Sequence, residues 1–137
     1  MKTFRELNAY AEPEVLESMV AKLTVTPFDG WLRDREGEER VRPLCGEGQV
    51  CFLFTGRAKA EGRDIALAMI QEGRRLFVAN IFPTEQGEIS IERYNSTLVE
   101  FFLKFLHPAA LETGVAITVS SDERERRNPS IGGQFPS

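Results

Sequence analysis

Three apolar runs separated by short polar breaks occupy the middle of this 137-residue chain. The runs cover residues 49–59, 63–71 and 75–82, with Glu61-Gly62 and Glu72-Gly73 between them. Short glycine-containing links between apolar runs are typical of β-hairpins, so the pattern predicts a three-stranded antiparallel meander. A helix over residues 64–70 is the alternative for the second run, because Ala, Leu and Met favour helices.

Both faces of this predicted meander are apolar. In the second run Ile65, Leu67 and Met69 alternate with the smaller Ala66 and Ala68. In the third run Phe77, Ala79 and Ile81 alternate with Leu76, Val78 and Asn80. Sheets that are apolar on both sides are usually covered on both sides, and we expect the same here. The alanines predict the side on which the helix after the meander packs closely.

The longest helical pattern follows the meander. Ser90 is a suitable N-cap, and Glu92 suits the positive end of the helix dipole. At 100° per residue, one apolar stripe contains Tyr94, Leu98, Phe101, Phe102 and Phe105. We expect Pro108 to kink or end this helix and Gly114 to stop it, before a last strand over residues 115–119.

The N-terminal part predicts two helices and two short strands. The run from Thr3 to Glu6 matches a capping box, which predicts a short first helix. Pro13 suits the first turn of a second helix, with an apolar face from Val15 to Leu23. Residues 31–33 and 40–42 are predicted strands around an acidic turn over residues 34–39, and a loop follows over residues 43–48.

These elements predict an α+β fold. We expect an antiparallel sheet of four to six strands, with one long helix packed on a face and one or two N-terminal helices on an edge or on the other face. Residues 1–121 form the single predicted domain. Residues 122–137 alternate charges and end in Pro, Gly and Ser, which is typical of a flexible tail.

Composition and charge exclude several classes of function. The formal net charge is −4 without a basic block, so nucleic-acid binding is not expected and a basic protein is the favoured partner. The first residues have no secretion-signal core, and no stretch reaches the roughly 18 apolar residues of a membrane span. We therefore expect a cytoplasmic protein that does not bind membranes, with reduced thiols.

The residues that carry chemistry are few. His107 is the one histidine, and we assign it a helix-dipole role near the end of the long helix. Cys45 lies in a predicted loop and Cys51 in a predicted strand, without the CxxC spacing of zinc or redox sites. A Cys45–His107 nucleophile pair is the catalytic alternative, but no third group to orient the imidazole is evident. We expect no metal, no cofactor and a role without catalysis.

Two asparagines flank the junction between the meander and the long helix. Asn80 ends an apolar run, and Asn95 lies near the start of the helix. Because buried amides usually satisfy backbone groups, we expect both to act as a structural clamp that pins the loop over residues 82–89. A ligand site is the alternative.

Three surfaces are candidates for partner binding. Trp31 follows a turn signal and is either a binding hot spot or partly buried. Asp34, Glu36 and Glu38 form an acidic hairpin tip that is either simply solvated or faces a basic partner. Val99 and Leu103 widen the apolar arc of the long helix to roughly 200°, which indicates either near-complete burial or pairing with another chain.

A pattern in the C-terminal half resembles a known group of proteins. It consists of Asn80-Ile81-x-Pro83, Tyr94-Asn95-x-x-Leu98, Phe101 or Phe102, Pro108, Gly114 and Ser121-Asp122-Glu123. This pattern, within about residues 76–123, is similar to small bacterial proteins without a settled function that are associated with toxin, immunity or defence gene neighbourhoods. The resemblance implies no catalytic residues.

Three functions remain open from the sequence. The first is a non-catalytic protein-binding module, for example an immunity- or antitoxin-like inhibitor of a basic protein. The second is a structural or regulatory homodimer built on the long helix. The third is a small enzyme or ligand carrier with a pocket between helix and sheet.

Overall fold

The computed structural model describes residues 3–25, 31–58, 63–84 and 87–121. The predicted tail from residue 122 and the predicted turn at residues 61 and 62 lie outside these ranges. The elements follow the order β1 (Leu7–Tyr10), α1 (Pro13–Val25), β2 (Trp31–Arg33), α2 (Arg35–Val41), η1 (Arg42–Leu44), β3 (Gln49–Ala58), β4 (Arg63–Glu72), β5 (Arg75–Pro83), α3 (Ile91–Phe101), η2 (Phe102–Leu106), α4 (His107–Thr113) and β6 (Ala116–Val119).

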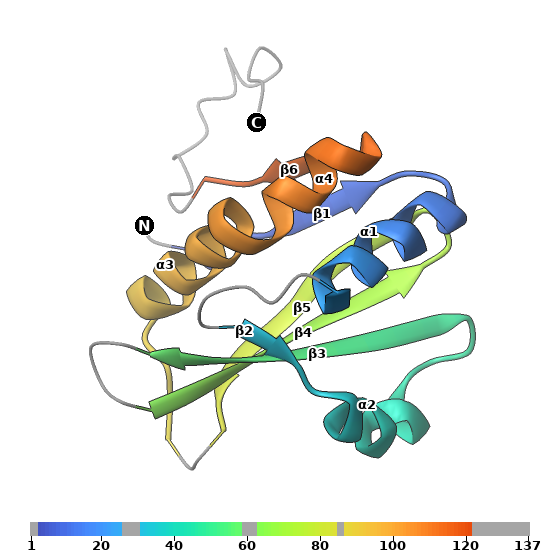
Figure 1. Ribbon diagram of the computed structural model, residues 1–137. Helices are drawn as coiled ribbons and strands as arrows, with labels where there is room; N and C mark the ends of the chain where they lie inside the picture. The colour runs from blue at the N-terminus through green and yellow to red at the C-terminus, as the bar shows by residue number, and fades with distance from the viewer. Residues whose placement is uncertain (1–2, 26–30, 59–62, 85–86, 122–137) are drawn as a thin grey trace, which may run out of the picture.

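The strands form one six-stranded antiparallel sheet, which confirms the predicted α+β class (Figure 1). Its strand order is β2-β3-β4-β5-β1-β6, with the predicted meander β3-β4-β5 at the centre. The second apolar run is strand β4 throughout, so the helical alternative for residues 64–70 is wrong. Pairing with two long neighbours decides this segment over its helix propensity.

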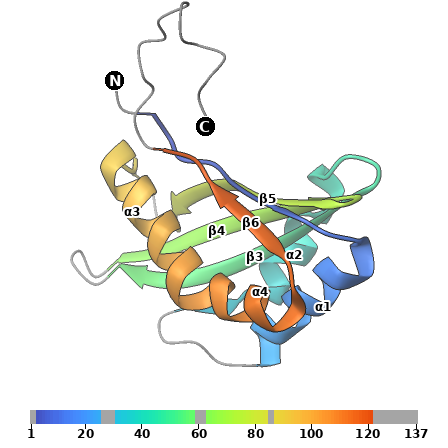
Figure 2. The same ribbon diagram turned by 90° about the horizontal axis from the view of Figure 1, so that it is seen from above.

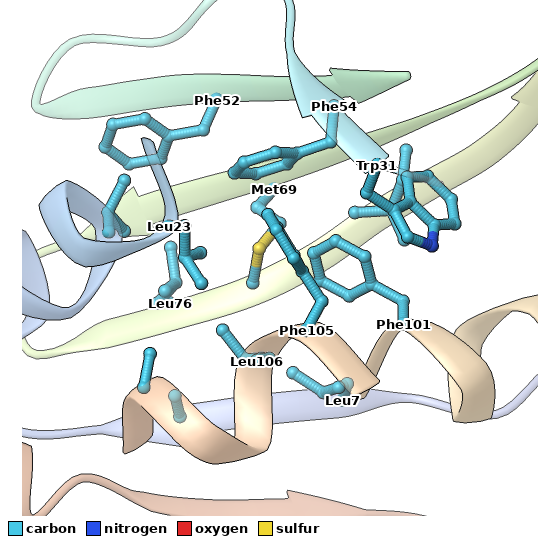
Figure 3. Packing of buried hydrophobic residues seen from close by; sticks show 14 of the residues in the cluster. Leu7, Leu23, Trp31, Phe52, Phe54, Met69, Leu76, Phe101, Phe105 and Leu106 are labelled. Carbon is cyan, nitrogen blue, oxygen red and sulfur yellow. The ribbon is translucent and has the colours of Figure 1, made fainter. Parts of the chain in front are cut away.

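Helices α1, α3 and α4 lie together on one side of the sheet (Figure 2). The expectation that an N-terminal helix covers an edge or the opposite face is therefore wrong, because α1 packs beside α4. Between these helices and the sheet lies a core in which Phe54, Phe101 and Phe105 pack ring against ring, with centroids 5.1–5.5 Å apart (Figure 3). Burying each such side chain stabilises the fold by roughly 1.5–3 kcal/mol.

Two N-terminal segments have a different secondary structure from the one that the sequence predicts. Residues 3–6 are not helical, and the chain enters β1, where Leu7 and Ala9 are fully buried and alternate with Asn8 and Tyr10. The predicted strand over residues 40–42 is instead the end of α2 and the start of η1. Asp34 decides this, because its carboxylate accepts from the Gly37 N–H at 2.9 Å and caps a helix.

The long helix passes Pro108 through a π-helical segment. Pro108 has no N–H, and its ring would clash with the Lys104 carbonyl in a regular α-helix. In η2 the His107 N–H donates to the Phe102 carbonyl five residues earlier, and α4 continues to Thr113. Gly114 then ends the helix with φ of 75°, as predicted. His107 consequently lies inside the helical run and not at its C-terminus, so its predicted dipole role is wrong.

Candidate functional site: the open face of the sheet

The side of the sheet away from α1, α3 and α4 is the candidate site, and we call it the open face. Cross-strand pairing arranges its side chains in three rows, which are Leu32, Thr55, Ala66 and Phe82; then Leu53, Ala68 and Asn80; then Cys51, Ile70, Phe77 and Asn8. Alternation along each strand sends the neighbouring residues into the helix-covered core. The open face therefore has an apolar centre on β4 and β5.

Most side chains of the open face are partly accessible to solvent. Ala68, Ile70, Phe77 and Phe82 are half-buried, and Leu32 is 67% exposed. Of the elements that the structure describes, α2 reaches this side, where it packs on β3 at the sheet edge. The expectation that both faces are covered is therefore wrong, and so is the assignment of the alanine side to the helix. Ile65, Leu67 and Met69 face the helices instead.

A β-bulge in β5 explains where Asn80 lies. Ala68 pairs with Asn80 while the next residue, Met69, pairs with Val78, so Ala79 is inserted between the pairs. The insertion turns Asn80 from the core side to the open face, where it is exposed and its Oδ1 accepts from the Ile81 N–H at 2.9 Å. The prediction of a buried clamp at Asn80 is wrong for this reason.

Asn95 is a buried clamp, but for a different segment. Its side chain is 5% exposed, its Nδ2 donates to the Thr3 carbonyl at 2.9 Å, and its Oδ1 accepts from the Arg5 N–H at 2.8 Å. These bonds fasten the chain before β1 to α3, not the loop over residues 82–89. The partner segment is about 90 residues away in sequence, which local pattern analysis does not detect.

A buried ion pair joins α2 to the sheet edge. Arg33 Nε donates to Glu38 Oε2 at 2.7 Å and its Nη2 donates to Oε1 at 2.9 Å. Glu38 Oε2 also accepts from the Leu53 N–H at 3.0 Å, beyond the point where β2 stops pairing with β3. The carboxylate thus takes the place of a strand at this edge, which caps a backbone donor that would otherwise face solvent.

The acidic residues of α2 are consequently used mainly within the protein. Asp34 caps the helix, Glu38 is buried at 7% exposure, and Glu39 pairs with Arg42 at 2.9 Å. Glu36 is exposed. The predicted acidic hairpin tip is therefore a capped helix, and two of its three proposed partner residues serve the fold.

The other proposed partner residues differ in how far they are exposed to solvent. Trp31 is 6% exposed and packs edge-on against Phe101 with centroids 5.1 Å apart, so an exposed hot spot there is wrong. Val99 is half-buried, and Leu103 is 56% exposed on the outer side of the long helix. Leu103 is thus the accessible member of that predicted surface.

A polar border runs along one side of the open face. The Arg75 guanidinium lies over the Phe77 ring, 4.1 Å from its centroid, and its Nε donates to Asn8 Oδ1 at 2.8 Å. Glu72, the cross-strand neighbour of Arg75, accepts from Gln49 Nε2 at 3.2 Å. An apolar centre beside a border of fixed opposite charges is a typical arrangement for a protein interface.

His107 and Cys45, the two residues of the catalytic alternative, each have a contact of another kind. The His107 ring packs against Phe102 with centroids 5.2 Å apart, and the Cys45 thiol donates to the Val41 carbonyl at 3.5 Å. Within the described residues, no group of three or more His, Cys, Asp or Glu side chains is placed to hold a metal ion. Among the same residues, no helix is long and apolar enough to cross a membrane.

Comparison of the chain with family models, with curated proteins and with solved structures gives no significant match. The candidate site is therefore defined by its geometry alone. The sequence pattern identifies the open-face residues of β3, β4 and β5 as strand residues but assigns them to covered surfaces.

Proposed function

We propose that this protein is a non-catalytic protein-binding module that receives a partner protein on the open face. One observation carries the proposal: the sheet has helices over one side, while its other side presents Ala68, Ile70, Phe77 and Phe82 partly to solvent. Large exposed apolar patches with polar rims mark interaction sites in globular proteins. The border formed by Glu72 and Arg75 would supply the polar rim.

The partner is proposed to be a different protein with a basic surface. The net charge of −4 gives a modest repulsion between two copies and a modest attraction for a basic protein. This attraction acts mainly on the association rate, whereas the apolar centre would supply the affinity. We therefore expect added salt to slow association and to change the dissociation rate little.

An inhibitor of the immunity or antitoxin kind is the specific form of this proposal. Its support is the resemblance of residues 76–123 to proteins from such gene neighbourhoods, together with the acidic charge. In that form the partner would be the product of a neighbouring gene, and binding would suppress the partner's activity.

The test compares two glutamates placed on opposite sides of the molecule. Ile70→Glu puts a charge at the centre of the open face, and Leu103→Glu puts one on the exposed side of the helix. The wild-type protein and both variants, checked for folding by circular dichroism, are used to recover partners from the native host. We expect Ile70→Glu to weaken binding of the recovered protein at least about tenfold and Leu103→Glu to leave it unchanged.

If Leu103→Glu weakens binding and Ile70→Glu does not, the interface lies on the long helix and the proposal is contradicted. Light scattering at micromolar concentration tests the second candidate, a homodimer. Two exposed leucines on the helical run, Leu103 at 56% and Leu111 at 71%, favour that candidate. A wild-type dimer that Leu103→Glu converts to a monomer would establish it.

A further inference from the structure

The two cysteines are separated by five residues along the chain and are brought together by a tight turn. The Gln49 N–H donates to the Gly46 carbonyl at 3.1 Å, and the Gly46 N–H donates to Gln49 Oε1 at 2.9 Å. Gly48 allows the reversal with φ of 79°. Cys45 therefore returns alongside the start of β3, close enough to Cys51 for its thiol to contribute to the raised pKa of Cys51. Both side chains are half-buried and reduced.

We propose that Cys45 and Cys51 form a reversible intramolecular disulfide by exchange with a small-molecule disulfide of the glutathione disulfide class. The Cys45 thiolate attacks one sulfur of that disulfide, and one small thiolate leaves and takes up the proton that Cys45 lost. The Cys51 thiolate then attacks Cys45 Sγ, which forms the protein disulfide, and the second small thiolate leaves and takes up the proton that Cys51 lost. Two protein thiols are oxidised and one small disulfide is reduced to two thiols.

The surroundings of Cys51 assign the order of these steps. Burial, then the adjacent Cys45 thiol, then the Glu38 carboxylate raise the pKa of Cys51 from 9.0 to about 11. A thiol with such a pKa is rarely a thiolate at neutral pH, so the first attack falls to Cys45. The groups facing Cys51 are Cys45 from the end of η1 and Glu38 from α2, whose charge Arg33 balances, while its β4 neighbour Ile70 is apolar.

The same surroundings make ring closure the slow and pH-dependent step. Once Cys45 carries the small thiol, its free thiol no longer contributes, but burial and the Glu38 carboxylate still raise the pKa of Cys51. The closure rate should therefore rise about tenfold per pH unit through the neutral range, in proportion to the thiolate fraction.

The disulfide would tie the end of η1 to β3 at the margin of the open face. Cys51 shares a row with Ile70 and Phe77, and the preceding α2 is the element that packs on this edge. Oxidation would therefore fix the segment from α2 to the turn against the sheet. This inference does not depend on the open face binding a partner.

The test follows the thiols of the full-length reduced protein. The protein is incubated with glutathione disulfide, quenched with N-ethylmaleimide and weighed intact. We expect loss of both free thiols together, with a mass decrease of about 2 Da. Trypsin should leave both cysteines in one peptide, residues 41–57, and cleavage after Glu47 should separate it into two pieces only after reduction.

Two serine variants make the order of events visible. Cys51→Ser should stop at a stable glutathione adduct on Cys45, and Cys45→Ser should react at least about tenfold more slowly than Cys51→Ser. Adduct closure in the wild-type protein is then timed between pH 7 and 9. The proposal is overturned if the wild-type adduct persists as long as that of Cys51→Ser, if both thiols stay free, or if the disulfide links two chains.

Discussion

Met69 and Ile70 are consecutive residues of the central strand β4 that lie in opposite surroundings. Met69 is fully buried in the core between the sheet and the helices. Ile70 lies on the open face between Cys51 and Phe77 and is half-buried. The two side chains are similarly apolar, so hydrophobicity alone does not tell a covered face from an uncovered one.

The difference between the two faces comes from the long helical run. The stripe that contains Leu98, Phe101 and Phe105 covers one side of the sheet, and α1 fills the remainder of that side. On the other side the short α2 covers Leu53, so closely that a Cβ on Gly37 would lie 2.9 Å from Leu53 Cδ1. An apolar surface that the described helices leave partly exposed is the basis of the proposed function.

The largest expected effect compares a phenylalanine from each face. Phe101→Ala should lower the free energy of unfolding by about 3–5 kcal/mol, because a fully buried ring that contacts Trp31, Phe54 and Phe105 is lost. Phe82→Ala, on the open face, should cost about 1–2 kcal/mol because its ring is already partly in water. Urea unfolding measures both, and equal losses would mean that the two faces are equally covered.

A second comparison concerns the edge where the faces meet. Glu38→Ala should cost about 3 kcal/mol or more, because it leaves the Arg33 charge and the Leu53 N–H without their carboxylate. The matched control is Glu112→Ala, which removes an exposed ion pair with Lys22 and should cost under about 1 kcal/mol. Similar melting temperatures for the two variants would show that the edge does not depend on Glu38.

A third comparison uses the two asparagines. Asn95→Ala should lower the free energy of unfolding by about 1–3 kcal/mol, since it removes both bonds to the chain before β1. Asn80→Ala should change it by less than about 0.5 kcal/mol, because the residue is exposed on the open face. Thermal unfolding measures both variants. A larger loss of unfolding free energy for Asn80→Ala than for Asn95→Ala would show that Asn80, beside the bulge, is the stabilising amide.

The smallest expected effect is on the outer surface of the long helix. Leu103→Ser should alter the free energy of unfolding by no more than about 0.5 kcal/mol, because the side chain is 56% exposed. A loss above about 2 kcal/mol in urea would show that this surface is covered, for instance by a second copy.

The sequence predicts the elements whose signals are local. The meander, the Ser90 cap, the Gly114 stop and the last strand all follow from neighbouring residues. The position of β1 between β5 and β6 depends on pairings such as Asn8 with Phe77 and Thr118. Such distant pairings leave no periodic signal, and the capping-box match in the preceding residues predicts a helix instead.

The candidate site depends on features with even weaker signals. The bulge at Ala79 reverses the faces for the rest of β5, and that reversal exposes Asn80. The approach of Cys45 to Cys51 depends on the turn from Gly46 to Gln49, for which the glycines at positions 46 and 48 are the sequence signal. Whether the open face is covered depends on which side α1 occupies, and its apolar stripe fits either side.

The central claim is that one face of the sheet is sealed by helices and the other is free to receive a partner. Hydroxyl-radical footprinting of the isolated protein, read by mass spectrometry, tests it most directly. The account predicts oxidation of Phe77 and Phe82 on the open face, with Phe54 and Phe101 protected. Equal protection of all four rings would contradict it, because the face proposed to bind a partner would then already be covered.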